Sequence, residues 1–299
     1  MGEPIRFFNR QTQRIEEEAV YGERFLRWAY ETTAGRAALH AFVKRPFFSK
    51  WYGWRMSSPA SRSKIAPFIR QYGLEPGEFL DSPGEFTSFN EFFARRLRDE
   101  ARPIHPDEKT AVLPADARHL CLPDVNAADH FFVKGQRFDL AALLGGDSRL
   151  ASRFQHGSLL FSRLCPVDYH RFHFPLDGTP STPRLLNGPL FSVSPLALRR
   201  NLAYLWHNKR VLTLHETQAA GTIAILEIGA TCVGSIHQTH TPDTPAAKGS
   251  EKGYFAFGGS CVITLFEKGA ITFAEDLVEH SAAARETLAH MGTPMGRLP

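Results

Sequence analysis

From about residue 111 onward, short apolar runs alternate with segments rich in Gly, Pro, Asp and Asn. The runs cover residues 111–113, 119–122, 131–133, 158–164, 211–214, 222–228, 232–236 and 262–266. Runs of this length between turn-forming residues predict β-strands. Apolar helix formers at 140–144 and 195–204 predict two helical insertions, and the tail after Asp276 predicts a helix that frays through 292–294. The pattern therefore predicts a β-rich domain over residues 106–299.

The first third of the chain has a different pattern. Over residues 16–30, apolar side chains follow a roughly helical spacing at Ala19, Val20, Phe25, Leu26 and Ala29. Further helices are predicted over residues 34–43, 61–72 and 88–96, the last with Ser88 and Glu91 as a capping box. We expect a helical region over residues 1–105 ahead of a β-rich catalytic domain of packed short strands. The predicted fold class is α+β.

One predicted strand or hairpin near the end of the chain is interrupted. Gly258-Gly259-Ser260-Cys261 stands between the apolar residues 254–257 and 262–266. Adjacent glycines weaken a strand interior and mark a bulge, a bend or a close backbone approach. One interpretation is a β-bulge that carries an ordinary serine. The other is a serine placed to attack its own preceding peptide bond, because an unhindered glycine carbonyl lies next to its hydroxyl.

Composition narrows the class of protein. The 299 residues are 43% hydrophobic and 22% charged, as in an ordinary folded protein. No segment approaches the ~18–20 apolar residues of a membrane span, and the first residues lack the apolar core of a signal peptide. Four cysteines are scattered without CxxC or Cys/His ligand spacing, which predicts reduced thiols in the cytosol and no zinc site.

The net charge of +4 is unevenly distributed. Residues 1–73 carry 13 Lys and Arg against 6 acidic residues, so the remainder is net negative. Aromatic and cationic residues interleave over residues 44–55, as they do in proteins that dock on a membrane interface. A helical subdomain that packs its aromatics on the core would give the same pattern. Single-stranded nucleic acid is not expected as a partner, since no RNA-binding motif accompanies the charge.

Three residue types suited to nucleophilic chemistry occur at the ends of predicted strands. His170 and His173 lie in a dense polar and aromatic segment bounded by Pro166 and Pro175. Asp116 follows the run 111–113 at a corner, where it forms an Asx-turn or orients an imidazole. With Ser260, these residues make a Ser-His-Asp set available. The hydrolase signature G-x-S-x-G is absent around the serine.

The motifs along nearly the whole chain resemble those of the phosphatidylserine decarboxylase family, bacterial type. The matching stretches are Asn9-Arg10-Gln11-Thr12, Tyr21-Gly22, Phe92-Phe93-Ala94-Arg95-Arg96-Leu97, Ala101-Arg102-Pro103-Ile104, Pro114-Ala115-Asp116, Lys134-Gly135, Leu143-Leu144-Gly145, Asp168-Tyr169-His170-Arg171-Phe172-His173, Gly188-Pro189-Leu190-Phe191-Ser192-Val193, Asn208-Lys209-Arg210-Val211, Gly229-Ala230-Thr231-Cys232-Val233-Gly234-Ser235-Ile236 and Gly259-Ser260. They occur in the family's order.

The resemblance implies an enzyme that decarboxylates phosphatidylserine to phosphatidylethanolamine. In this family the precursor cuts itself, here between Gly259 and Ser260, into subunits 1–259 and 260–299. His173 held by Asp116 would deprotonate Ser260, which becomes a pyruvoyl group and forms a Schiff base with the substrate amine. His170 would position the substrate or handle the proton. This covalent pyruvate would be the only cofactor, without metal or pyridoxal phosphate.

The resemblance also implies a location and partners. We expect a peripheral protein on the cytoplasmic face of an anionic membrane that contains phosphatidylserine. The two cleaved subunits would remain associated. Association of two copies into a homodimer is one possible oligomeric state. Two positions depart from the family pattern: Cys261 replaces a threonine, and Ala117 replaces a glycine. Three other functions stay open, namely a pyruvoyl decarboxylase for a free amino acid, a Ser-His-Asp hydrolase, and a non-enzymatic lipid-binding module.

Overall fold

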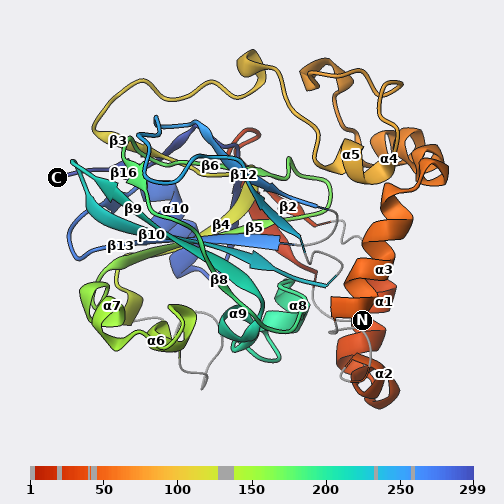
Figure 1. Ribbon diagram of the computed structural model, residues 1–299, viewed down its shortest axis with the longest axis horizontal. Helices are drawn as coiled ribbons and strands as arrows, with labels where there is room; N and C mark the ends of the chain where they lie inside the picture. Colours follow the sequence, from red (N-terminus) through yellow and green to blue (C-terminus); the bar gives the residue numbers. More distant parts are fainter. Residues whose placement is uncertain are drawn as a thin grey trace.

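A ten-stranded sheet forms the centre of the molecule (Figure 1). The computed structural model describes residues 4–18, 22–39, 41, 46–126, 138–231, 235–256 and 260–299. The strand order is β2-β1-β15-β4-β5-β13-β10-β9-β7, and β8 also pairs with β9. All neighbours are antiparallel except β1 and β15. The strands are β1 (Arg6–Asn9), β2 (Arg14–Glu17), β4 (Ala117–Leu122), β5 (Ser158–Leu164), β7 (Thr179–Pro180), β8 (Arg184–Leu186), β9 (Arg210–Thr217), β10 (Gly221–Gly229), β13 (Ser260–Phe266) and β15 (Glu286–Ala289).

Short helices cover one face of this sheet. In Figure 1, α6 to α9 lie below the sheet and α1 and α2 at its right. The core that these helices cover includes Leu159, Phe161, Ile263 and other apolar residues of the central strands. These helices are α1 (Glu23–Glu31), α2 (Thr33–Ala38), α6 (Leu140–Leu143), α7 (Ser148–Arg153), α8 (Pro195–Leu198) and α9 (Tyr204–His207). The insertion predicted at 140–144 is thereby confirmed, and that predicted at 195–204 is helical only over Pro195–Leu198, with α9 beginning at its last residue.

Two three-stranded sheets and one helix cover the opposite face. The first small sheet has the order β11-β12-β6, and the second has the order β14-β16-β3. Between them and the central sheet lies a second core, which includes Val262, Phe172 and Phe255. Strands β5 and β13 are therefore buried on both faces, which explains why their sequences are nearly continuous apolar runs. The elements are β3 (Thr110–Val112), β6 (Arg171–His173), β11 (Ile236–Gln238), β12 (Glu251–Phe255), β14 (Thr272–Phe273), β16 (Pro294–Arg297) and α10 (Glu275–Ala282).

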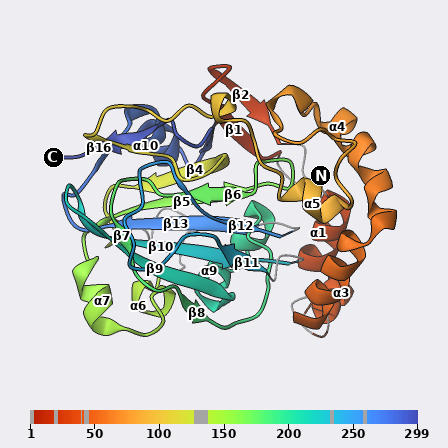
Figure 2. The same cartoon turned by 45° about the horizontal axis from the view of Figure 1, so that its top comes forward.

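The remaining helices gather on one side of the sheets (Figure 2). They surround a third core, rich in phenylalanine, in which Phe92 and Phe93 are almost completely buried. Ser88 caps α5, because its hydroxyl accepts a hydrogen bond from the Glu91 N–H (3.2 Å). The other half of the predicted capping box does not form, since the Glu91 carboxylate binds Thr87. The elements are α3 (Pro46–Ser57), η2 (Pro59–Lys64), α4 (Ile65–Tyr72), η3 (Pro76–Glu78), α5 (Phe89–Phe93) and η4 (Asp99–Ala101).

The α+β fold class is confirmed, but both ends of the chain differ from the sequence prediction. The helix expected over residues 16–30 begins only at Glu23, since β1 and β2 form a hairpin at the edge of the central sheet. The tail expected to fray after α10 instead forms β15 and β16. Strands of four residues carry too little apolar periodicity to be recognised in isolation, and pairing with β1, β4 and β3 stabilises them.

Candidate active site

Ser260 begins β13 in the middle of the central sheet. Its backbone pairs with Gly229 of β10 on one side and with Leu164 of β5 on the other. The side chain is fully buried, and its Oγ has no hydrogen-bond partner among the described residues. Side chains alternate along a strand, so Ser260 faces the same core as Val262, between the central sheet and the small sheets. The predicted cleavage residue Gly259 lies outside the described residues.

Ser260 lies where the chain passes between the central sheet and the first small sheet. Strand β5 ends at Leu164, opposite Ser260, and its continuation leads to β6 in the first small sheet. Strand β12 of that small sheet leads back to Ser260, and it pairs with β6. The connections are also joined directly, because the Phe255 N–H donates to the His170 carbonyl (2.9 Å). Ser260 therefore lies at the seam between two sheets, next to the segment that carries both predicted histidines.

His170 lies in this seam with a defined tautomer. The side chain is fully buried, and its ring lies against Phe93 with the ring centroids 3.8 Å apart. Nδ1 lies 2.9 Å from the Asp168 carbonyl oxygen. A carbonyl only accepts hydrogen bonds, so Nδ1 carries a proton and Nε2 is the ring atom left for proton exchange. The position suits the predicted role of His170 in positioning substrate or handling a proton.

His173 is held in its neutral form. Burial lowers the pKa of this residue to about 4, although Glu251 and Asp116 act to raise it. Its ring stacks on Tyr169 at 5.7 Å, and its Nδ1 has no hydrogen-bond partner among the described residues. Its neighbour Phe172 packs on Phe255 inside the core, so alternation along β6 turns His173 to the other side of the strand. No hydrogen bond between His173 and Ser260 is present in the described residues.

Asp116 is next to His173 but is bound to other groups. The His173 N–H donates to the carbonyl of Pro114, two residues before Asp116 (2.7 Å). The carboxylate itself accepts hydrogen bonds from Arg102 Nε (2.8 Å) and from the Met291 N–H (2.9 Å). It is therefore oriented by a buried ion pair. Arg102 was missed as a partner in the sequence, although it lies within the family motif 101–104.

A buried ionic cluster, also not predicted from the sequence, lies near the end of β5 on the face of the sheet opposite to the Ser260 side chain. Arg163 is the cross-strand neighbour of Cys261 and binds the carboxylates of Glu18 and Glu286. Burial raises the pKa of Glu18, but the Arg163 guanidinium outweighs this effect and brings it to about 2. Arg118 adds a second cation that pairs with Glu18 and Asp168. These residues are far apart in the sequence, so no local pattern could reveal the cluster.

A second buried ion pair lies near Ser260, because Glu227 is the cross-strand neighbour of Val262, two residues along β13. Glu227 is two residues before Gly229, and its carboxylate lies 2.8 Å from Lys252 Nζ. Both side chains are fully buried, and Gln238 hydrogen-bonds to each of them. Burial raises the pKa of Glu227 and lowers the pKa of Lys252, while the mutual attraction opposes both shifts. The pair therefore places polar side chains whose two charges cancel on the same face of the sheet as Ser260.

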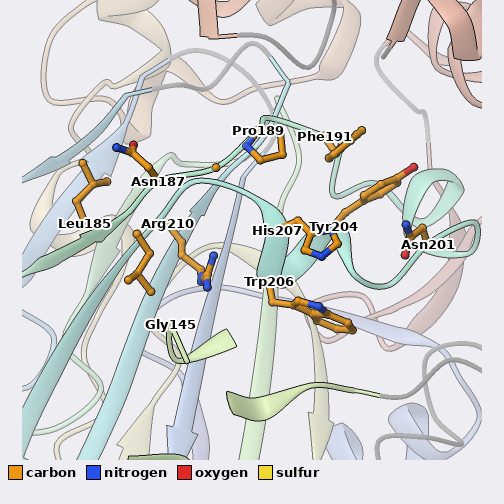
Figure 3. Close-up of a pocket in the computed structure, with 12 residues that line it drawn as sticks. Gly145, Leu185, Asn187, Pro189, Phe191, Asn201, Tyr204, Trp206, His207 and Arg210 are labelled. Atoms are coloured by element: carbon orange, nitrogen blue, oxygen red, sulfur yellow. The ribbon is translucent and has the colours of Figure 1, made fainter. Parts of the chain in front are cut away.

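An open cavity of about 890 Å³ lies on the helix-covered side of the sheet. Figure 3 shows Asn187, Arg210 and His207 around it. All of the Arg210 nitrogens donate to backbone carbonyls, those of Leu143, Asn208 and Ala142. Arg210 is therefore committed to the fold. The cavity lies on the side of β10 opposite to that faced by the Ser260 hydroxyl, so it is not the histidine seam.

Comparison with known proteins identifies the family. The family model described as phosphatidylserine decarboxylase matches residues 89–296. A phosphatidylserine decarboxylase proenzyme of Chlamydia muridarum is 44% identical over 97% of this chain and 96% of its own length. Proenzymes of the same name from Chlamydia pneumoniae (42%; 97% of this chain and 96% of its own) and Fusobacterium nucleatum (40%; 98% of each chain) are similar. This chain belongs to the phosphatidylserine decarboxylase family.

The family and enzyme class predicted from the motifs are confirmed. The region matched by the phosphatidylserine decarboxylase model contains Asp116, His170, His173 and Ser260, and it begins at α5. The helices α1 to α4 lie outside it, although the full-length relatives extend over them. The domain boundary at residue 105 and the individual residue roles stay predictions. Within the described residues, no group of three or more His, Cys, Asp or Glu side chains is arranged to hold a metal ion.

The described helices also bear on membrane association. None of them is long and apolar enough to cross a membrane. Helices α1 and α3 nevertheless expose large aromatic side chains to solvent, namely Phe25, Trp28, Phe47, Trp51 and Trp54. We call these five residues the aromatic face.

Proposed function

We propose that this phosphatidylserine decarboxylase is made as a precursor that cuts itself between Gly259 and Ser260. The observation that carries this proposal is Ser260, whose buried hydroxyl has no hydrogen-bond partner among the described residues. A buried hydroxyl without a partner costs free energy, which selection tolerates where the group has a chemical role. Its cross-strand neighbour Gly229 has no side chain, which leaves space beside the serine.

The cut follows from the chemistry of serine. The Oγ proton passes to a base, Oγ attacks the Gly259 carbonyl carbon, and the peptide nitrogen takes the proton from the base as its bond to that carbon breaks, which gives an ester and a free amine. Loss of the Ser260 Cα proton then expels the Gly259 carboxylate and leaves dehydroalanine. Its tautomer reacts with water and releases ammonia, which leaves a pyruvoyl group at the start of the 260–299 subunit. That group supplies an electron-accepting carbonyl for decarboxylation of an amine substrate.

We assign the proton transfers to the two histidines. His173 is a neutral base at pH 7 because burial holds its pKa at about 4, and the negative charge of Asp116 stabilises the imidazolium that forms. His173 must approach the Ser260 hydroxyl for the transfer. The Asp168 carbonyl holds the Nδ1 proton of His170, which leaves Nε2 for substrate positioning and proton transfer during decarboxylation.

We infer that the aromatic face docks on an anionic membrane. Phe47, Trp51 and Trp54 are spaced four and three residues apart, so they share one side of α3. Phe47 and Trp54 are 73% and 71% exposed, which is unusual for side chains of this size. The basic first quarter of the chain adds attraction to acidic headgroups. The aromatic face therefore favours a peripheral location at the cytoplasmic membrane surface. It also favours phosphatidylserine over a free amino acid as the substrate.

Intact mass of the purified protein tests the cut. We expect a fragment that begins at residue 260 with a pyruvoyl mass, and only the full chain in Ser260→Ala. A single uncut wild-type chain that releases no CO₂ from phosphatidylserine vesicles would contradict the proposal. His173→Ala and Asp116→Asn should block cutting in folded protein, whereas His156→Ala, an exposed histidine, should cut normally. Normal cutting in the first two variants would remove these residues from the mechanism.

A further inference from the structure

Arg95 differs from the other buried arginines of the described chain. Arg118, Arg163 and Arg210 bind carboxylates or several carbonyls, as shown above. Arg95 is 5% exposed, and its Nε and Nη1 have no hydrogen-bond partner among the described residues. Its Nη2 makes one long hydrogen bond to the Val167 carbonyl (3.4 Å). The guanidinium instead lies against the rings of Phe79 and Phe92, each with its centroid 5.0 Å away.

The guanidinium carries a positive charge that the fold leaves partly unbound. Burial lowers the pKa of Arg95 to about 10, so the group is still protonated at neutral pH. Asp116 and Asp168 raise the pKa from a distance, but no carboxylate lies within ion-pair distance in the described residues. A buried cation with free N–H donors is costly unless a counter-charge reaches it. An anionic ligand would provide that counter-charge.

The place of Arg95 narrows the choice of ligand. It follows α5, whose Asn90 donates to Ser57 at the end of α3, the helix that carries most of the aromatic face (3.1 Å). On its other side, α5 presents Phe93 to His170, and the Arg171 side chain donates to the Ala94 carbonyl (2.8 Å). Arg95 therefore lies between the surface proposed to meet the membrane and the seam proposed to hold the reacting group.

Phosphatidylserine has two anionic groups, a carboxylate and a phosphodiester. The carboxylate loses its charge as CO₂ leaves, so an ion pair with it would stabilise the ground state more than the transition state. The phosphodiester keeps its charge throughout, and it lies between the serine and the acyl chains. We propose that Arg95 binds the phosphodiester of the lipid headgroup and thereby selects a phospholipid over a free amino acid. This assignment rests on the proposed function.

Two substrates of matched chemistry test the assignment. One is dihexanoyl phosphatidylserine, and the other is O-octyl serine, an ether in which the chain is attached directly to the serine oxygen. In the purified, processed enzyme, Arg95→Gln should lower kcat/KM for the phospholipid about 10- to 100-fold, mainly through KM. The ether should change by less than about threefold, since it lacks the group that Arg95 binds. Arg95→Lys, which keeps the charge with a different geometry, should fall between wild type and Arg95→Gln.

Arg96→Gln is the matched control, because it removes the same charge from the adjacent, exposed residue. It should leave both substrates unchanged. An equal loss on both substrates in Arg95→Gln would assign Arg95 to the fold alone, and no loss on either would remove it from substrate binding. If Arg95→Gln does not fold, competition by glycero-3-phosphocholine decides, since it is a water-soluble phosphodiester: it should be weaker in Arg95→Lys than in wild type, and equal competition overturns the proposal. A wild-type protein that neither cuts nor releases CO₂ would instead contradict the proposed function.

Discussion

Ser260 stands directly opposite Gly229 in the β10–β13 pair, and the Gly229 carbonyl is held by the side chain of Asn208 (3.0 Å). Asn208 is fully buried and also exchanges two hydrogen bonds with the backbone of Phe191. One amide therefore ties the loop before α8 to the strand that positions the serine.

Asn208→Ala should destabilise the fold and slow the cut. It leaves the Phe191 N–H and one or two carbonyls without partners, at a cost of about 2–4 kcal/mol in the free energy of unfolding. Urea unfolding in a Ser260→Ala background measures this without interference from cleavage. Asn187→Ala, in the same loop but exposed, should cost less than about 0.5 kcal/mol. Equal effects of the two substitutions would contradict the role given to Asn208.

The pH profile of self-cleavage should report a histidine with a depressed pKa. The proposed base is active only when neutral, so the rate rises as pH increases through the pKa of His173, which is about 4. At pH 5 the rate should already be about nine-tenths of its plateau. Newly synthesised chain from cell-free translation, incubated across pH 3.5–8 and analysed by mass, gives the profile. A midpoint near the ordinary value of about 6.5 would argue against a buried His173 as the base.

Glu18 should make stability depend on pH at the acidic end. Its folded-state pKa, about 2, lies below the ordinary value of 4.5 because Arg163 outweighs the effect of burial. The stabilisation is thus fully present above pH 4.5 and is lost as pH falls toward 2. It amounts to about 3 kcal/mol, which Glu18→Gln should remove at neutral pH. Glu17→Gln, whose side chain is 60% exposed, is the control and should cost less than about 1 kcal/mol. Similar losses in both variants would contradict the cluster's role.

Removing one member of the Lys252–Glu227 pair should lower the free energy of unfolding far more than replacing both members with apolar residues. Lys252→Met leaves the Glu227 carboxylate buried without its cation, which should cost about 3–5 kcal/mol. The double variant Glu227→Leu/Lys252→Met removes both charges, and its loss should be below about 1 kcal/mol. Urea unfolding of the single and double variants measures the difference. Additive losses would show that the two side chains do not act as a pair.

Vesicle binding should depend on the aromatic face. Phe47→Ser/Trp54→Ser removes two highly exposed rings, and we expect at least tenfold weaker partition onto vesicles that contain phosphatidylserine. Leu185→Ser is the control, since it removes an exposed apolar side chain from β8. Co-sedimentation at low and high salt separates the aromatic contribution from the electrostatic one. Unchanged binding together with a loss of dimers in light scattering would reassign the face to contact between two copies.

Part of the site could be predicted because its signals are local. The Gly-Gly-Ser interruption marked the start of β13, and the dense segment 165–175 marked the connection that carries His170 and His173. The capping residue Ser88 was also correct, since a cap involves neighbours within one turn. The terminal strands β2, β15 and β16 were missed, because four residues show no distinct period until a partner strand is present.

The sequence by itself determined the family, the α+β class and the positions of Ser260, His170, His173 and Asp116 along the chain. Only the tertiary structure decided which groups these residues contact. It pairs Asp116 with Arg102, turns His173 to the far side of β6, and buries Arg95 with no ion-pair partner among the described residues. The reason is physical: a hydrogen bond or ion pair depends on distances between segments far apart in the chain, whereas a motif or a period depends on neighbours along it.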